Sequence, residues 1–229
     1  MNRYYCLYTE ESGSELHIYG DITSWPWLES DVSSFNLSKE LAELDSTKPL
    51  TVYINSYGGE VAEGIAIYNQ LKRFEQCKTV VDGYAASIAS VIFMAGKERV
   101  MSPSSLLFIH NAWMRTAGNS VQLRKDADDL EKITAASMQA YLEHVNIGED
   151  KLKEMLDAET WLNADEAVEM GFATEKAVAG ASGKPSQSAR DKFAEMWQKA
   201  LKPVQQALPE PEESPMQKFF KSMAKRKDD

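Results

Sequence analysis

Cysteine is almost missing from this sequence, which contains only Cys6 and Cys77 among its 229 residues. The two cysteines form no CxxC motif, and histidines and cysteines are not clustered as they are in a structural zinc site. The sequence therefore argues against a disulfide-stapled scaffold, and we expect neither a metal nor an organic cofactor. Because free cysteines suit a reducing compartment, we also expect a cytoplasmic protein.

Long apolar runs and excess positive charge are missing as well. No stretch of about 18 apolar residues could span a membrane, and the amino-terminal residues lack the apolar core of a signal peptide. The net charge of −10 argues against binding along a nucleic-acid backbone, which requires lysines and arginines to neutralise phosphates. The chain has neither a GxxxxGK nor a GxGxxG motif, so we expect no nucleotide site. We thus expect no membrane association and no nucleic-acid partner.

The chain does contain enough apolar sequence for one domain, since 43% of its residues are hydrophobic. Its composition changes near residue 179, where a stretch rich in alanine, glycine, serine and proline predicts a linker. An apolar stripe over 193–201 predicts an amphipathic helix, and an acidic spacer and a basic end follow it. We therefore predict a globular domain over residues 1–178 and a helical or disordered tail over 179–229 that docks on a partner.

Short β-branched runs alternate with turns and helical segments along the first part of the chain. Alternating apolar residues near the amino terminus predict two strands, around Tyr4–Tyr8 and Leu16–Ile18. The repeated strand, turn and helix units that follow imply right-handed crossovers and an α/β fold with a mainly parallel sheet. The predicted helices cover residues 37–44, 61–71, 88–95 and 120–145, and the strands between them are TVYI, TVV and LLFI.

Three polar turns stand at the carboxyl ends of these parallel strands, over residues 55–60, 82–87 and 110–113. In open parallel sheets, ligands bind in the crevice beyond the carboxyl ends of the strands. We therefore expect the three turns to face one crevice, where chemistry can take place.

Gly58 and Gly59 belong to the first of these turns. Consecutive glycines between a strand and a helix can present backbone N–H groups to a developing oxyanion or to a phosphate. Glycines also occur in tight turns that have no chemical role. The local sequence does not separate these two interpretations.

Ser87 ends the second turn, at the predicted start of an apolar and therefore buried helix. A hydroxyl at this point stands at the mouth of a strand, beside the N–H of Ile88, which is a further candidate oxyanion donor. Judged locally, Ser87 is a nucleophile, a helix cap or a small packing residue. Ser90 competes with it for the role of nucleophile.

His110 follows the third strand, and a serine nucleophile needs a base such as imidazole. Of the three histidines, His17 falls on an early strand and His144 at the end of a charged helix, so only His110 lies on the predicted crevice side. The acid that orients the imidazole must come from the fold, and sequence spacing does not choose it. The candidates within DAETWLNADEA are Asp157, Glu159, Asp165 and Glu166, the last of which also fits a helix capping box.

Four segments taken in order resemble the Clp protease proteolytic-subunit family of serine peptidases: YINSYGGEVAEGIAIYNQL, DGYAASIASVIFMAG, LLFIHNAW and ETWLNADEAVEMGF. The resemblance covers about residues 16–176 and is strongest to the Clp-like proteases of phage head-assembly modules. It implies a crotonase-like spiral of ββα units with a mainly parallel sheet. It also implies assembly into rings, with the long helix in the contacts between subunits.

The resemblance assigns roles to individual residues. The serine of the family's AAS motif falls on Ser87, which takes the role of nucleophile, and the histidine after the apolar strand falls on His110 as general base. The oxyanion hole of the family falls on Gly58 and Gly59, and the N–H of Ile88 completes it.

The third member of the triad falls on Glu159 by this resemblance, because Trp161 and Leu162 align with the Phe-Leu pair of the family's motif. The family commonly carries aspartate here, and glutamate is one methylene longer. Asp157 is therefore kept as the alternative acid.

These assignments predict a serine endopeptidase that hydrolyses peptide bonds through an acyl-enzyme in a homo-oligomeric ring, heptameric or built of stacked rings. The phage resemblance implies a role in head maturation, with capsid or scaffold proteins as substrates. It also implies a capsid, scaffold or portal protein as partner and the host cytoplasm as location. The use of an ATP-driven unfoldase stays open, because the chain has no nucleotide motif of its own.

Two other interpretations compete with this one. A related enzyme would keep Ser87 and use a lysine as its base, for which Lys97 is the nearest candidate. A non-catalytic ring or scaffold protein would instead bind a partner through the tail. Labelling with a fluorophosphonate, which requires an activated serine, separates the scaffold from both enzymes.

Overall fold

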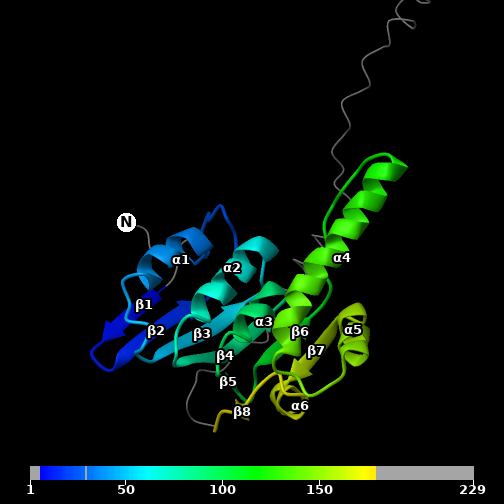
Figure 1. Cartoon of the computed structure of the whole chain (residues 1–229). Helices are drawn as coiled ribbons and strands as arrows, with labels where there is room; N and C mark the ends of the chain where they lie inside the picture. The colour runs from blue at the N-terminus through cyan, green and yellow to red at the C-terminus, as the bar shows by residue number, and fades with distance from the viewer. Residues whose placement is uncertain (1–5, 29, 179–229) are drawn as a thin grey trace, which may run out of the picture. The chain divides into compact units, whose positions relative to one another are not determined.

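The computed structural model describes residues 6–28 and 30–178, and the predicted tail over 179–229 lies outside the described residues. Figure 1 shows one sheet with helices packed against it. The strands are β1 (Cys6–Glu10), β2 (Gly13–Ile18), β3 (Leu50–Ser56), β4 (Cys77–Ala86), β5 (Glu98–Met101), β6 (Leu106–Ile109), β7 (Thr160–Asn163) and β8 (Glu175–Lys176). The helices are α1 (Ser34–Leu41), α2 (Val61–Leu71), α3 (Ile88–Phe93), α4 (Ser120–Leu142), α5 (Glu149–Asp157) and α6 (Ala164–Glu169).

The sheet is mostly parallel. Its strands follow the order β1-β2-β3-β4-β5-β8, and β6 pairs with both β4 and β7. The pairs from β2 to β8 along this order are parallel, as is the pair of β4 with β6. Among the described strands, only the pairs β1 with β2 and β6 with β7 are antiparallel. The prediction of an α/β fold with a mainly parallel sheet is confirmed.

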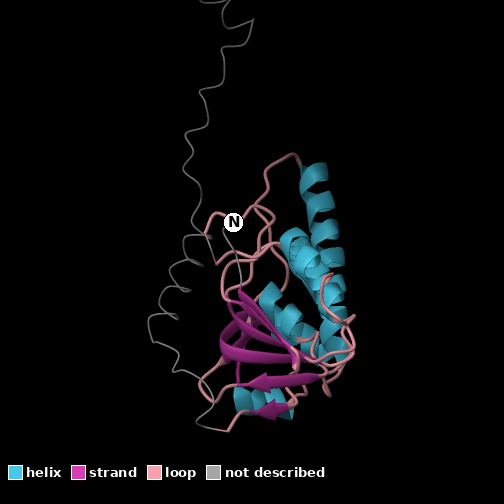
Figure 2. Ribbon diagram, turned by 90° about the vertical axis from the view of Figure 1, so that its left-hand side faces the viewer, coloured by secondary structure: helices cyan, strands magenta, loops and turns pink. Residues whose placement is uncertain are grey.

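The core lies between the sheet and the helices that cover one of its faces (Figure 2). Alternate residues of β2 and β3 point into this core, because side chains on successive strand positions face opposite sides. Their buried members include Leu16, Ile18, Val52 and Ile54. All residues of α3 are buried, which confirms the burial predicted for a segment that is apolar on every side.

Strand β4 is longer than the sequence predicts. The sequence predicts a polar turn over residues 82–87, yet the strand continues to Ala86. The reason is a second partner: the first half of β4 pairs with β5, and Tyr84–Ala86 then pair with Leu106–Phe108 of β6. The register with β3 shifts at the same place, where the Asn55 side chain accepts the N–H of Tyr84 at 3.2 Å.

The helix boundaries also differ from the predicted ones. Helix α1 begins at Ser34 rather than Leu37, because Ser33 caps it by accepting the N–H of Asn36. The helices predicted over 88–95 and 120–145 end earlier, as α3 and α4 show. The strands β5, β7 and β8 are not predicted, because such short strands show little hydrophobic periodicity. Helix α5 is not predicted either, although its buried Leu152, Met155 and Leu156 have helical spacing.

The long helix α4 has a buried end and an exposed end. Its buried residues, Met138, Ala140 and Tyr141, all lie in its last turns. Val121 and Leu123 near its start are exposed, and Figure 1 shows this half of the helix extending beyond the sheet. Only the last turns of α4 therefore pack on the core of the chain. Neither α4 nor any other helix in the described part of the chain is long and apolar enough to cross a membrane.

Candidate active site

The ends of β4 and β6 lie side by side and lead into Ser87 and His110. In these parallel strands Ala86 pairs with Phe108, and the Ser87 N–H continues the pairing by donating to the Phe108 carbonyl at 2.9 Å. Both segments then leave the sheet at the same edge, as parallel strands must. The Ser87 Oγ consequently lies 2.7 Å from the His110 Nε2, within hydrogen-bond range.

Ser87 has an unusual backbone conformation. Its φ and ψ angles are 56° and −129°, and the only other non-glycine residue with a positive φ among the described residues is Glu159. Such a conformation costs about 1–3 kcal/mol, so the surrounding structure must hold it. Ser87 occupies the N-cap position of α3, but its side chain accepts no backbone N–H there. The interpretation of this serine as a side-chain helix cap is therefore wrong.

The imidazole of His110 lies in a largely buried, aromatic environment. Burial lowers the pKa of His110, and a hydrogen bond with the Asn111 backbone and the negative charge of Glu159 raise this pKa by smaller amounts. The Phe108 ring stacks on the imidazole with 5.2 Å between ring centroids, and Trp161 stacks on Phe108 at 4.5 Å. A neutral imidazole is thus held with its Nε2 against a hydroxyl, as a general base requires.

Strand β7 brings one candidate acid toward His110. Strands β6 and β7 are antiparallel with Ile109 paired to Thr160, and the same register extended by one residue places Glu159 opposite His110. The charge of Glu159 accordingly raises the pKa of His110. Within residues 6–28 and 30–178, however, the exposed Glu159 carboxylate makes no hydrogen bond to the imidazole. The structure thus brings this acid near the base.

The other candidate acids are engaged elsewhere. Asp157, at the end of α5, accepts a hydrogen bond from the Asn111 side chain at 2.6 Å and so adjoins the residue after His110. Asp165 forms an ion pair with a lysine of β8, and Glu166 belongs to the capping box of α6. The capping role predicted for Glu166 is confirmed.

The Gly58–Gly59 turn after β3 approaches the serine closely. Both glycines have positive φ angles, 95° and 147°. A Cβ at Gly58 would lie 2.8 Å from the Ser87 Cβ, so a side chain fits there only if the serine moves. The turn is fastened to an earlier segment, because the Gly58 carbonyl accepts the Ile22 N–H at 2.9 Å.

The three predicted oxyanion residues are not equivalent. The Gly58 N–H donates to the Ser56 Oγ at 3.1 Å, so this donor is already engaged. The N–H groups of Gly59 and Ile88 make no hydrogen bond to any described residue. Gly58 also leaves space beside Ser87, and Gly59 and Ile88 retain available donors.

The sequence of this chain matches known proteins across the region that forms the site. A family model described as Clp protease matches residues 31–178, which include every candidate site residue. The chain belongs to the Clp protease family. The ATP-dependent Clp protease proteolytic subunit 2 of Treponema denticola is 32% identical over 150 residues, which are 59% of this chain and 75% of that protein.

Two further relatives of the Clp protease family are ATP-dependent Clp protease proteolytic subunits of similar identity. That of Deinococcus radiodurans is 30% identical over 139 residues, which are 58% of this chain and 68% of the relative. That of Bacteroides thetaiotaomicron is 30% identical over 151 residues, which are 63% of this chain and 69% of the relative. The resemblance seen in the four sequence segments is confirmed, and membership in this family makes the chain a serine endopeptidase.

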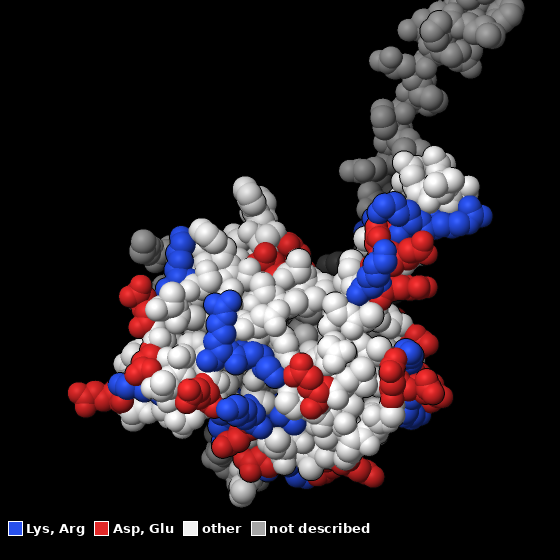
Figure 3. Space-filling view, viewed as in Figure 1, with Lys and Arg blue, Asp and Glu red and all other residues white. Residues whose placement is uncertain are grey.

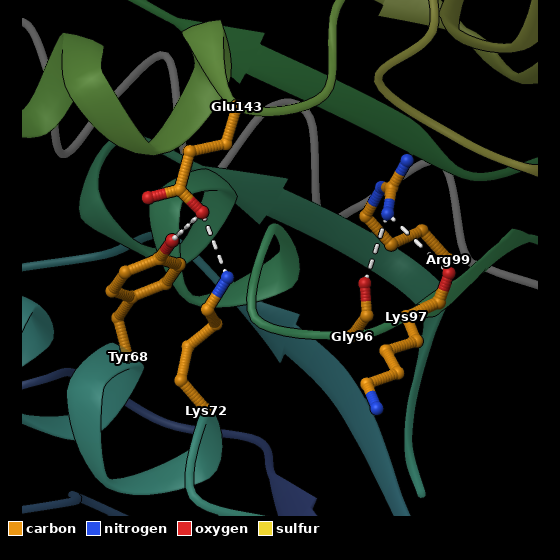
Figure 4. Close-up of polar contacts among 6 residues, drawn as sticks. All are labelled: Tyr68, Lys72, Gly96, Lys97, Arg99 and Glu143. Carbon is orange, nitrogen blue, oxygen red and sulfur yellow. Dashed lines mark hydrogen bonds and ion pairs between the residues drawn. The ribbon is translucent and has the colours of Figure 1, made fainter. Parts of the chain in front are cut away.

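Lys97 lies far from the serine in this Clp protease fold. Its backbone N–H donates to the Cys77 carbonyl at the start of β4, whereas Ser87 follows the end of β4. A strand of ten residues spans roughly 30 Å. Figure 4 shows the Arg99 guanidinium against the carbonyls of Gly96 and Lys97 at this remote end. The interpretation of Lys97 as the base for Ser87 is therefore wrong.

A small pocket opens beside Ser87 and His110. None of the residues described in its lining is an acid, a lysine or an arginine, so the pocket offers no counter-ion to a charged side chain. Its apolar wall includes Val61, Ile88, Val91, Ala112 and the ring of Tyr141.

Sequence reasoning missed polar residues that support the site from behind. The Ser56 hydroxyl donates to the Gly20 carbonyl at 2.6 Å and accepts the Gly58 N–H, so it organises the glycine turn. Its signal in the sequence is a serine at an inward-facing position of β3. Ser90 is fully buried and bonded to Tyr141, so it is no competing nucleophile.

Proposed function

We propose that Ser87 is the nucleophile and His110 the general base of a peptidase that works through an acyl-enzyme. The observation that carries this proposal is the 2.7 Å contact between the Ser87 Oγ and the Nε2 of a partly buried imidazole whose pKa is lowered. His110 takes the hydroxyl proton while Ser87 attacks the scissile carbonyl, and the imidazolium then protonates the leaving amine. Water, activated in the same way by His110, hydrolyses the ester and regenerates the serine.

The N–H groups of Gly59 and Ile88 hold the oxyanion that forms during each attack. Support comes from their availability as donors and from the close approach of the glycine turn to the residues around Ser87. Loss of one such donor typically lowers kcat by about 10²–10³-fold.

Glu159 orients the imidazole and stabilises its charged form. Its place opposite His110 in the register of β6 and β7, and its effect on the pKa of His110, favour it over Asp157. Asp157 already accepts the Asn111 side chain. Catalytic hydrogen bonds often tighten only when substrate is bound, so an exposed Glu159 is compatible with this role.

The preferred substrate is a peptide with an uncharged, apolar side chain next to the scissile bond. This proposal is supported by the pocket beside Ser87, whose described lining holds no charged group outside the catalytic histidine. A charged side chain would lose its hydration there without gaining a counter-ion. Peptides with leucine or methionine at this position should therefore be cleaved faster than those with aspartate or lysine.

The catalytic domain spans residues 1–178, the segment 179–229 forms a separate tail, and copies of the domain assemble into a ring. The ring is supported by the outer half of α4, where Val121 and Leu123 are exposed. Charged side chains of both signs, including the Lys125–Asp129 ion pair, lie on the same half of α4 (Figure 3). Such a mixed surface suits contact with a second copy. Native mass spectrometry gives the number of copies, and a monomer at micromolar concentration would contradict the ring.

The biological role that we propose is phage head maturation, with capsid or scaffold proteins cleaved in the host cytoplasm. The support is the resemblance of the sequence segments to phage Clp-like proteases. The tail would bind a capsid, scaffold or portal protein. Co-expression with phage head proteins should give cleavage products with the wild-type chain and none with Ser87→Ala. Uncleaved head proteins in both cases would contradict this role.

Fluorophosphonate labelling tests the catalytic assignment directly. We expect an adduct on Ser87 in the assembled wild-type protein, none in Ser87→Ala and much slower labelling in His110→Ala. An assembled wild-type protein that takes up no label would instead favour a non-catalytic scaffold. Cleavage of a short peptide alongside a folded protein then shows whether an ATP-driven unfoldase is needed for the folded substrate.

A further inference from the structure

Ser90 and Tyr141 form a buried polar pair behind Ser87 and take no part in the chemistry proposed above. Their exposed fractions are 0% and 2%. The Ser90 Oγ lies 2.6 Å from the Tyr141 hydroxyl oxygen and 2.5 Å from the carbonyl oxygen of Ser87. Hydroxyls in an apolar core cost free energy unless they are hydrogen-bonded. The groups that accept these hydrogen bonds therefore indicate what the pair stabilises.

The hydrogen bonds of this pair run in one direction. A carbonyl oxygen only accepts, so the single hydrogen of the Ser90 hydroxyl points to the Ser87 carbonyl. Tyr141 must then donate to the Ser90 Oγ. Burial raises the pKa of Tyr141, so the phenol keeps its proton over the pH range in which a peptidase works. The chain of donors therefore leads from Tyr141 through Ser90 to Ser87.

The Ser87 carbonyl belongs to the same peptide group as the Ile88 N–H. Because a peptide group is planar and trans, its C=O and N–H point in opposite directions. The Ser87 carbonyl accepts the Ser90 hydroxyl and also the Ser90 N–H, the latter at 2.9 Å. Two donors that hold the carbonyl on the buried side thus direct the Ile88 N–H to the other side of the peptide.

The orientation of this peptide group depends on a strained residue. The ψ angle of Ser87, which turns the plane of the following peptide, is −129° in combination with a positive φ. A strained conformation persists only where neighbouring groups hold it. The donors on the Ser87 carbonyl act on this torsion directly.

We propose that Ser90 and Tyr141 are positioning residues that keep the Ser87–Ile88 peptide turned so that the Ile88 N–H faces the oxyanion. This inference rests on the proposed acyl-enzyme function. Just beyond Tyr141, the C-cap residue of α4, Glu143, contacts the end of α2. There Glu143 accepts hydrogen bonds from Lys72 at 2.7 Å and from Tyr68 at 3.2 Å (Figure 4).

Tyr141→Phe tests the inference in the full-length assembled protein, because it removes the hydroxyl and keeps the ring. We expect kcat for a fluorogenic peptide to fall about 10-fold with KM within about 2-fold, since the defect arises as the oxyanion forms. Ser90→Ala removes the hydroxyl that contacts the carbonyl and should lower kcat further. The double variant should be no slower than Ser90→Ala, because both residues act through one chain of bonds.

Tyr68→Phe is the matched control. It removes the phenol hydroxyl of another tyrosine with a largely buried ring, which bonds at the same end of α4 but does not lead to the Ser87 carbonyl. We expect it to change Tm about as much as Tyr141→Phe does and to leave kcat within about 2-fold of wild type. Equal losses of kcat in the two variants would show a general effect of α4 packing and would overturn the inference. An unchanged kcat in Tyr141→Phe would overturn it as well.

Ser87→Ala in the same assay separates this inference from the proposed function. If Ser87→Ala retains hydrolysis, the proposed nucleophile is wrong and the inference falls with it. If Ser87→Ala abolishes hydrolysis while Tyr141→Phe keeps the wild-type kcat, only the inference is wrong. Circular dichroism verifies the fold of each variant, and Tyr141→Phe alone decides the matter if Ser90→Ala fails to fold.

Discussion

Helix α3 has a buried polar cluster near each end, and the two clusters are built differently. Beyond its carboxyl end, Arg99 is only 6% exposed. The Arg99 guanidinium donates to four backbone carbonyls, those of Gly96, Lys97, Gly171 and Phe172. At the amino end of α3, Ser87 meets His110, while the N–H groups of Gly59 and Ile88 keep their hydrogen-bonding capacity among the described residues.

The two clusters differ in how they use their hydrogen-bond donors, and this difference separates a cluster that stabilises the fold from one that can catalyse a reaction. The Arg99 cluster uses its donors to satisfy carbonyls of the surrounding loops, so it holds the fold together. The Ser87 cluster combines backbone strain with available donors and a base of lowered pKa, all of which cost stability unless a substrate uses them. Burial of polar groups alone therefore does not indicate an active site. Unused hydrogen-bond donors beside a residue with a strained backbone do indicate one.

The largest expected effects on kcat and on stability come from two variants, Ser87→Ala and Arg99→Met, one in each cluster. Ser87→Ala should lower kcat by at least about 10⁴-fold with little change in the free energy of unfolding, because it removes the attacking group. Arg99→Met should destabilise the fold by about 3 kcal/mol, since it leaves buried carbonyls unpaired, and keep kcat per folded molecule within about 2-fold. Peptide hydrolysis and thermal unfolding measure the two quantities. A large loss of kcat in a stably folded Arg99→Met variant would contradict the purely structural role of the Arg99 cluster.

Gly58→Ala should have the next largest effect. The new Cβ would lie 2.8 Å from that of Ser87, at a residue with a φ of 95°, so the serine or the turn must move. We expect kcat to fall about 100-fold, as it does when an oxyanion donor is displaced. Gly148→Ala is the matched control, because a Cβ there meets nothing within 4 Å, and it should be as active as wild type. Comparable losses in both variants would contradict the tight approach at Gly58.

A smaller effect concerns the pH dependence of kcat/KM, which reports the base of the free enzyme. Burial lowers the pKa of His110, so the acid limb of the wild-type profile should lie below the ordinary pKa of histidine. The charge of Glu159 raises this pKa, so Glu159→Gln should move the acid limb to still lower pH while kcat falls about 10-fold. Asp157→Asn should leave the limb in place. The opposite pattern would transfer the role of orienting acid to Asp157.

The smallest expected effect is that of Lys97→Ala. Lys97, just before β5, lies beside the start of β4 with an exposed side chain, whereas Ser87 follows the end of β4. We expect kcat within about 2-fold of wild type, since the variant changes only the surface at the remote end of β4. A decrease in kcat of more than about 10-fold without a change in Tm would instead support Lys97 as the base.

The serine and the histidine could be predicted because their signals are local. A β-branched run predicts a strand from its own residues, and the polar residue after a parallel strand belongs to the edge where ligands bind. Ser87 and His110 both follow such runs. The strained φ of Ser87 could not be predicted in this way, because it results from the pairing of β4 with β6 and from the donors on its carbonyl.

The roles of the remaining site residues could not be predicted from the local sequence alone. Gly58 is visible in the sequence, but its N–H is engaged by Ser56, whose hydroxyl is placed by a carbonyl of an earlier segment. Sequence spacing does not choose among four acids near residue 160. The family resemblance assigns Glu159, and the register of β6 with β7 places this residue opposite His110. Periodicity alone predicts the mainly parallel sheet, since repeated strand and helix units have few ways to connect.

By itself, the sequence determined the alternation of the main strands and helices and the polar residues Ser87 and His110 at strand ends, because these depend on neighbours in the chain. Only the tertiary structure decided that Glu159 stands opposite His110, that Lys97 lies at the remote end of β4 and that Tyr141 bonds to Ser90 behind the nucleophile. Each of these contacts joins segments that are distant in sequence. Register and packing between such segments follow from the whole core, and no local pattern encodes them.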